Sequence, residues 1–562
     1  MAQGEFDIQV LKEGRWLTEA IRASEMDARA LAKTYLKNPQ CAGARVVANQ
    51  VKGDGTVSES VIFQETQTVS GGKPVRIQPL DAAPIWCKSP KDLFGLECRM
   101  VLNRLFREYL EEAKLTPTEV LHSYKQLQRL FDRDTLRFSA VSHIATLQVK
   151  GREISAKDRQ AQLNKIVDQV TQQAREAQSI KLPKLKGKFS DTLAAMPKVD
   201  SHPVEYLAMV VLARDLTNIP SWTGKIDRLC DMALHEHDRT ALLLLDTVIA
   251  DLLGANVIQE LLGWQRSLGS AIISMLDLAD GVFDTTESDA RGTADRLITL
   301  FQENALPASQ RVLVDRALRQ LKSSAPLYKA DPSKEMEEYQ RVLARLLVPG
   351  GILSGAQAAE ALTLRGSQFV EAGGKSGRRA AISATFEALP DPARGAMYLA
   401  ELSKTELNED HMDDIVTQLD VVFSARVINQ LCQQSMSHKD RMVTATGAYQ
   451  ATASSALPDD IKTQVTEHID SVLERYLIDE NIIDRLDSPG THIRDRAVRL
   501  VKFCGAGVLP EGKALKLARK RIVKLLKQPN FDEHFIEGIG DPAKAEKALR
   551  DFHKLLVQGG LA

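Results

Sequence analysis

The spacing of apolar residues changes once along the 562-residue chain, near residue 80, and this change limits the folds that the chain can adopt. Before it, apolar residues alternate with polar ones, as at Phe6, Ile8 and Val10, which is the period of a strand with one buried face. After it, apolar residues recur at the spacing of an amphipathic helix. The sequence therefore predicts a mainly α protein, in which a small α/β domain precedes a long irregular helical bundle or solenoid of antiparallel helix pairs.

Residues 1–80 predict a ββαββ module. Its helix begins after Ser24, a good N-cap residue, and ends before Asn38-Pro39. The segments Glu13-Gly14-Arg15 and Lys52-Gly53-Asp54-Gly55 are typical of tight turns that join antiparallel strands. We expect the helix to cover one face of the sheet, and the glycine- and proline-rich segment up to Pro84 to form an exit linker.

Turn residues divide the rest of the chain into further segments. We expect a helical domain, a linker, an array of helical hairpins, a helical continuation and a basic C-terminal helical cap, at 84–180, 181–203, 204–350, 351–480 and 481–562 respectively. Candidate helices of the back half lie at 204–217, 222–237, 239–253, 256–279, 289–303, 308–322, 333–347, 355–371, 378–388, 392–404, 409–419, 424–434, 439–454, 459–477, 491–503, 511–527 and 541–557. No fixed repeat recurs, so a regular repeat array is not predicted.

The charge balance and the cysteines restrict the class of protein. Lys and Arg number 73 and Asp and Glu 74, so the whole molecule has no strong field to attract nucleic acid or anionic lipid. The chain opens without the pattern of a secretory signal, and its apolar stretches are shorter than a transmembrane helix of ~20 residues. The scattered cysteines favour free, buried thiols in a reducing compartment; they are Cys41, Cys87, Cys98, Cys230, Cys432 and Cys504. We therefore expect a cytoplasmic protein without a transmembrane segment.

One glycine-rich segment has part of the pattern of a phosphate-binding loop. Such a loop needs a glycine five residues before its Gly-Lys-Ser step, and Phe369 stands at that position. Glycines and basic side chains at the start of a helix can nevertheless hold an anion. The segment therefore predicts a candidate anion site formed by Lys375, Ser376, Arg378 and Arg379. The alternative is an ordinary turn between helices with Ser376 as the N-cap.

No residue pattern indicates a metal site, a cofactor or a catalytic centre. His235 and His237 lie two residues apart and so point to different sides of a helix, whereas metal ligands on a helix are three or four residues apart. Cys504 lies beside a glycine turn, and nothing in the sequence places a base next to it, so we interpret it as a packing residue. We expect no metal and no cofactor, and we assign no catalytic residue.

The segment 513–527 is a basic amphipathic helix. From Gly490 to the C-terminus, fifteen Lys or Arg residues stand against eight Asp or Glu residues. Such a helix can meet phosphates, anionic lipid or an acidic protein surface, and no aromatic residues are interleaved for base stacking. The candidate partner-binding residues on this helix are Lys516, Arg519, Lys520, Arg521 and Lys524. The alternative is the solvated outer face of a terminal capping helix.

Large aromatic residues are the other candidates for contacts with a partner. Trp16, Trp222 and Trp264 are the residues most able to anchor such a contact, although we expect Trp264 to lie in the core, within the helix 256–279. The leading hypothesis is a helical scaffold or adaptor that binds a protein partner, favouring an acidic one, through grooves between helix pairs. The alternatives are a ligand-responsive regulator or all-helical enzyme whose site comes from separated helices, and binding of nucleic acid or an anionic surface through the basic helix. The sequence predicts neither the partner's identity nor the oligomeric state.

Overall fold

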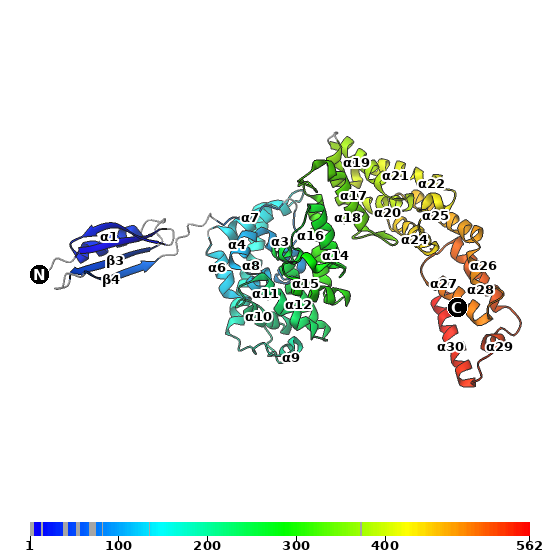
Figure 1. Ribbon diagram of the computed structural model, residues 1–562, viewed down its shortest axis with the longest axis horizontal. Helices are drawn as coiled ribbons and strands as arrows, with labels where there is room; N and C mark the ends of the chain where they lie inside the picture. Colours follow the sequence, from blue (N-terminus) through cyan, green and yellow to red (C-terminus); the bar gives the residue numbers. More distant parts are fainter. Residues whose placement is uncertain are drawn as a thin grey trace. The chain divides into compact units, whose positions relative to one another are not determined.

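A computed structural model describes residues 5–12, 15–36, 43–51, 57–66, 75–80, 83–133, 135–370 and 374–561 (Figure 1). It is mainly helical, with a small sheet near the N-terminus, as the sequence predicts. The turns predicted at Glu13-Gly14 and Lys52–Gly55, part of the predicted exit linker, and Cys41 lie outside the described residues. Contacts divide the chain into two compact units, Met1–Asn256 and Val257–Ala562.

The N-terminal domain is an antiparallel sheet with one helix on one face. Its elements are β1 (Glu5–Lys12), β2 (Arg15–Arg22), α1 (Glu25–Leu36), β3 (Gly43–Val51) and β4 (Val57–Thr66), and the strand order is β2-β1-β3-β4. Alternation along the strands turns Ile8 and Val46 toward Ala28 and Ala32 of α1, and these residues are fully buried. Figure 1 shows α1 lying over the sheet. The prediction of a ββαββ module with the helix on one face is confirmed.

In the described part of the first unit, eleven further helices follow the N-terminal domain. They are α2 (Pro90–Leu93), α3 (Leu96–Leu105), α4 (Arg107–Ala113), α5 (Pro117–Leu121), α6 (Tyr124–Phe131), α7 (Leu136–Gln148), α8 (Ala156–Ser179), α9 (Phe189–Ala194), α10 (Val204–Leu216), α11 (Trp222–Leu234) and α12 (Arg239–Leu253). The predicted linker 181–203 contains α9, whose Phe189 is fully buried. Helices α10 and α12 pack on α5 and α3, so residues 204–256 join the helices that precede the linker.

The second unit is a chain of packed helices. Its α-helices are α13 (Val257–Leu262), α14 (Leu268–Ala279), α15 (Arg291–Gln302), α16 (Pro307–Lys322), α17 (Glu335–Leu346), α18 (Ala356–Gly366), α19 (Gly374–Ala388), α20 (Pro392–Leu402), α21 (Asn408–Gln418), α22 (Asp420–Ser424), α23 (Ile428–Leu431), α24 (His438–Ala453), α25 (Asp459–Asp479), α26 (Ile482–Leu486), α27 (Ile493–Gly505), α28 (Lys513–Leu526), α29 (Phe531–Ile536) and α30 (Pro542–Gln558). Short 3₁₀ helices lie at Thr285–Glu287, Pro332–Lys334 and Ser367–Phe369, and a small hairpin at β5 (Leu347–Val348) and β6 (Gly351–Ile352). Helix α14 packs on α16, α16 on α18 and α18 on α20, so the apolar faces are buried pairwise along the chain.

The predicted helix 256–279 was wrong, because the chain breaks it into α13 and α14. Gly263 between them has φ +66°, and a Cβ there would lie 1.7 Å from the carbonyl oxygen of Glu287. Only glycine fits this left-handed position against another backbone. Trp264 follows in the loop with 76% of its surface exposed, so the prediction that it lies in the core was also wrong.

The predicted helix 424–434 was wrong in a similar way. The chain forms α22 and α23 instead, with extended backbone at Ala425 between them. The carbonyl oxygen of Ala425 accepts a hydrogen bond from His468 Nε2 (2.8 Å), and that of Arg426 accepts one from Arg475 Nη1 (2.7 Å). Side chains of α25 therefore satisfy the carbonyl groups that the broken helix leaves unpaired. The short helices α26 and α29 were not predicted from the sequence.

All the described cysteines are buried and form no disulfide. Cys87 and Cys98, eleven positions apart, have their Sγ atoms 3.0 Å from each other. Among the described residues, no helix is both long enough and apolar enough to span a membrane.

Candidate functional site

The basic helix α28 is fixed at its N-terminus by a carboxylate from another helix. Asp470 of α25 accepts hydrogen bonds from the backbone N–H groups of Lys513 (2.5 Å) and Ala514 (3.1 Å). These N–H groups have no partner within their own helix, so Asp470 supplies the cap that the local sequence lacks. The apolar face of α28 is buried, and its cationic side chains are left on the outer face.

The five predicted cations of α28 divide into two groups. Arg519 donates two hydrogen bonds to Glu511, both 2.9 Å long. Arg521 donates to Asp484 (2.9 Å) and also to the buried Asp487, which pairs with Arg496 as well. These two arginines are therefore neutralised within the protein.

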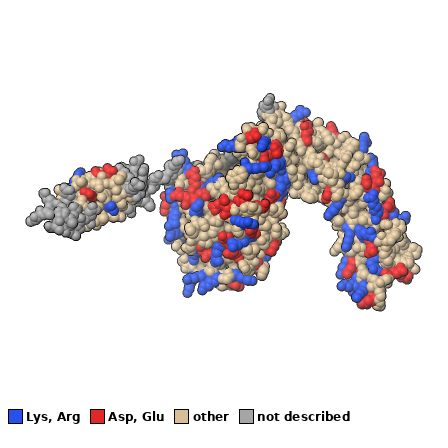
Figure 2. Space-filling view, in the orientation of Figure 1, with Lys and Arg blue, Asp and Glu red and all other residues tan. Residues whose placement is uncertain are grey.

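The other group consists of the lysines Lys516, Lys520 and Lys524. All three are exposed, and none has an ion-pair partner among the residues that the structure describes. They are four residues apart, so they form one stripe along α28. Figure 2 shows Lys and Arg side chains gathered on the C-terminal part of the chain.

A pocket of 320 Å³ lies beside this stripe, between α25, α26 and α28. Leu477, Ile478, Ile483 and Leu517 give it apolar walls, and Ile478 is 56% exposed. Lys520, Arg521 and Lys524 of α28 line one side of the pocket. Asn481, on the turn between α25 and α26, and Asp484 of α26 also line it. Asn481 has φ +51°, the left-handed conformation that ends α25 and lets α26 turn away. The pocket thus combines an exposed apolar surface with unpaired positive charge.

The candidate anion site is only partly described. Helix α19 begins at Gly374, so Ser376 lies inside the first turn and is not the N-cap. Ser376 is exposed, Arg378 is half-buried, and the side chain of Lys375 lies outside the described residues. Arg379 is directed to a neighbouring helix, since its Nε is 3.1 Å from the Asp414 carboxylate. Anion binding here stays a prediction.

The two candidate tryptophans occupy different environments. Trp16 in β2 is half-buried, and the Arg45 guanidinium lies 4.6 Å from the centre of its ring. Trp222 begins α11 and is only 4% exposed, and its indole N–H donates to Glu111 (3.2 Å). The Trp222 ring is thus engaged inside the protein, whereas Trp264 is the more accessible indole.

In the acidic and histidine-rich segment near His235, the Glu236 carboxylate binds backbone N–H groups of the protein. Glu236 is 5% exposed, and its carboxylate accepts backbone N–H groups from Ser190 (2.8 Å), His237 (2.9 Å) and Asp238 (3.1 Å). Burial would raise the pKa of Glu236, but these hydrogen bonds outweigh it and lower the pKa. Among the described residues, no three His, Cys, Asp or Glu side chains are grouped to hold a metal ion.

Sequence reasoning missed a buried network of charges in the first unit. Lys225 Nζ lies 2.7 Å and 2.8 Å from the two carboxylate oxygens of Glu119, and both residues are fully buried. Arg99 pairs with Asp251 (2.9 Å), which also accepts the Thr118 hydroxyl (2.6 Å). More than a hundred residues separate the partners of each ion pair, so no local pattern could have revealed them.

Beside this network lies a pocket of 560 Å³ that is lined by Phe94, His122 and Tyr206. Burial lowers the pKa of His122 to about 4, so its ring is neutral at neutral pH. Its Nδ1 bonds the Thr118 carbonyl oxygen (2.8 Å), and its Nε2 has no partner among the described residues. Because the Thr118 hydroxyl donates to Asp251, it does not form a nucleophile–base pair with His122. The ring can offer a hydrogen-bond acceptor to a ligand.

No protein-family profile, curated protein sequence or solved structure matches the chain. Its function is therefore inferred from the geometry of its own residues.

Proposed function

We propose that this chain is a cytoplasmic helical scaffold or adaptor that captures an acidic, apolar segment of a protein partner in the pocket between α25, α26 and α28. One observation carries the proposal: the exposed Ile478 and the walls of the pocket lie next to Lys520 and Lys524, which have no acidic partner among the described residues. An exposed apolar surface bordered by charge is typical of a protein-interaction site.

The two parts of the pocket have separate physical roles. Burying one Leu or Phe side chain of the partner against Ile478 and Leu517 would contribute about 1.5–3 kcal/mol. The lysine stripe would raise the association rate of an acidic segment and disfavour a basic one. Because these lysines are exposed, their contribution falls as the salt concentration rises.

The proposal is tested by selecting random short peptides from a display library on the full-length protein. We expect the selected peptides to combine Asp or Glu with a large apolar residue. Binding of these peptides, followed by fluorescence anisotropy, should weaken about tenfold or more in the Lys520→Glu/Lys524→Glu variant and in Ile478→Glu.

A matched control reverses two exposed lysines that do not line the pocket. The Lys502→Glu/Lys547→Glu variant carries the same change of net charge and should bind the selected peptides nearly as well as the natural chain. Selection of peptides without acidic residues, or equal losses in both double variants, would show that the pocket is not the binding site.

A further inference from the structure

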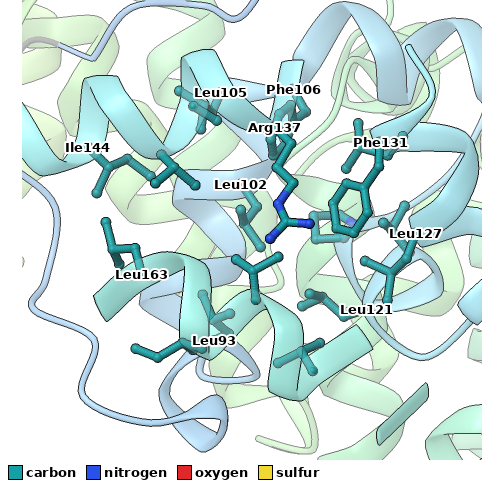
Figure 3. A pocket seen from close by; sticks show the side chains of 18 of the residues that line it. Leu93, Leu102, Leu105, Phe106, Leu121, Leu127, Phe131, Arg137, Ile144 and Leu163 are labelled. Carbon is teal, nitrogen blue, oxygen red and sulfur yellow. The ribbon is translucent and has the colours of Figure 1, made fainter. Parts of the chain in front are cut away.

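The first unit contains another pocket, which is separate from the proposed partner-binding pocket. It has a volume of 100 Å³ and is enclosed by helices α2 to α8 (Figure 3). Apolar side chains form its walls, among them Leu102, Leu121, Ile144 and Leu163. Among the residues that the structure describes, Arg137 of α7 is the only charged one that lines it.

The walls of this pocket make it unsuitable for water. A water molecule needs two or more polar partners, and the apolar walls offer none. Apolar cavities of this kind stay dry and take up small apolar molecules; a cavity of about 150 Å³ binds benzene. The pocket at α2–α8 therefore matches a short hydrocarbon group of about four to five carbons.

Arg137 gives the pocket a charged mouth. Figure 3 shows its guanidinium among the apolar side chains, next to Phe131. The guanidinium lies 4.8 Å from the centre of the Phe131 ring, and 31% of the side chain is exposed, so Arg137 connects the cavity to solvent. Its Nη2 donates to Asp168 (2.5 Å), whereas Nε and Nη1 have no partner among the described residues.

We propose that this pocket binds a short-chain carboxylate, with the hydrocarbon in the cavity and the carboxylate on Arg137. Arginine offers several N–H donors in a planar fork that suits a carboxylate. Asp168 already holds one of these donors, but its side chain is 64% exposed, and an exposed ion pair is weak enough to be exchanged. The ligand carboxylate would then either share the guanidinium or displace Asp168.

The size of the pocket and its charge together select this class of ligand. A membrane lipid has acyl chains several times too long for 100 Å³. An alkylammonium ion of the same chain length would fill the cavity equally well but would meet a cation at the mouth. A neutral alcohol would gain the apolar contacts without the charge-assisted hydrogen bonds.

The experiment compares hexanoate, hexanol and hexylammonium on the full-length protein by titration calorimetry and ligand-observed NMR. Hexanoate should bind with a Kd of about 1 mM or below, at least fivefold more tightly than hexanol, and hexylammonium should bind most weakly. The Arg137→Gln variant should bind hexanoate and hexanol alike. Asp168→Asn removes the competing carboxylate, so it should tighten hexanoate binding about two- to fivefold and leave hexanol unchanged.

Variants of the cavity and a matched arginine provide the controls. Ala140→Val and Val167→Leu each add carbon atoms to the wall and should weaken hexanoate and hexanol together. Arg133→Gln removes another exposed, ion-paired arginine that does not line the pocket, and it should change nothing. The ligand series on the natural chain decides the matter even where a variant fails to fold. Equal affinity for hexanoate and hexanol, or no binding of any of the three at about 10 mM, would overturn the proposal.

Discussion

At the scale of single residues, the buried Lys225–Glu119 ion pair is the contact on which we expect the stability of the fold to depend most. Lys225 also donates to the Lys114 carbonyl oxygen (2.5 Å), so its ammonium group is hydrogen-bonded to this oxygen as well as to the Glu119 carboxylate. Burial lowers the pKa of Lys225, while the Glu119 carboxylate opposes this effect. Removing one partner would leave the other charge buried without compensation.

We therefore expect Lys225→Met to lower the free energy of unfolding by about 3–5 kcal/mol. Urea unfolding of the full-length protein, followed by circular dichroism, measures the loss. The double variant Lys225→Met/Glu119→Gln removes both charges and should recover a large part of the stability. If the single and double variants unfold at the same urea concentration, Glu119 is not the reason for the loss.

His122 should make stability depend on pH in a defined window. Its pKa is lowered from 6.5 to about 4 in the folded protein, by burial first and then by Arg99. Between these values the unfolded chain binds a proton that the folded chain does not, so stability falls as the pH drops from 6.5 toward 4 and is unaffected above 6.5. The full loss is about 3 kcal/mol.

The measurement compares urea unfolding of the natural chain and of His122→Gln between neutral pH and about pH 4.5, in the lower half of this window. The difference in stability between the two proteins should shrink by about 2 kcal/mol over that range, because only the natural chain has this titration. A difference that stays constant with pH would mean that His122 titrates normally in the folded protein.

The residue types in α28 do not by themselves show which cationic side chains lack an ion-pair partner. The sequence identifies the basic helix and its apolar face correctly, because both depend on local spacing. It does not separate Arg519 and Arg521 from the lysines, since Asp484 and Asp487 reach Arg521 from another helix. The pocket beside Ile478 is likewise a product of packing between distant segments.

At the scale of elements, the contact between Cys87 and Cys98 joins the segment before α2 to the first turn of α3. The hydrogen bond from Cys98 lowers the pKa of Cys87, whereas this same contact and burial raise the pKa of Cys98. Cys87 is therefore the better nucleophile of the two. The sequence did not indicate this pair. The two residues are eleven positions apart, and no other cysteine lies between them to form a recognisable motif.

Hydrogen peroxide should oxidise this pair in two steps. The Cys87 thiolate attacks peroxide and becomes a sulfenic acid with loss of hydroxide; the Cys98 thiol then attacks that sulfur and releases water, which leaves a disulfide. Mass spectrometry of unreduced peptides should find the Cys87–Cys98 bond. In Cys98→Ser, a sulfenic acid at Cys87 should react with dimedone. A Cys87 that stays reduced while Cys230, a buried cysteine elsewhere in the unit, is oxidised would contradict this expectation.

Helix boundaries were predictable wherever the local sequence determines them. The stripe of α8, the start of α12 at Asp238 and the proline start of α20 follow from periodicity and capping. The failures at Gly263 and Ala425 occur where another segment contacts the backbone, Glu287 in one case and α25 in the other. Such contacts leave no trace in a local window of sequence.

At the scale of the whole molecule, the boundary between compact units differs from the segment that looks like a linker. Pro and Gly make 181–203 resemble a linker, but the contacts divide the chain between Asn256 and Val257. The reason lies in the buried charges: Glu119 and Arg99 come before the predicted linker, and their partners Lys225 and Asp251 come after it. The front helices therefore depend on residues 204–256 for their ion pairs as well as for apolar burial.

This dependence distinguishes two fragments of the chain. The fragment 1–256 contains both ion pairs and should unfold cooperatively on heating, with the helical circular dichroism signal expected from α1–α12. The fragment 1–200 keeps Arg99 and Glu119 but lacks Asp251 and Lys225, so folding would bury two uncompensated charges and leave the faces of α3 and α5 exposed. We expect it to show no sharp thermal transition for its helices and to be cut rapidly by protease within 84–180.

Neutralising Glu119 and Arg99 in the short fragment should restore little, because the apolar surface of α10 and α12 is still missing. A fragment 1–200 that melts as sharply as 1–256 would place the structural boundary at the proline-rich segment after all.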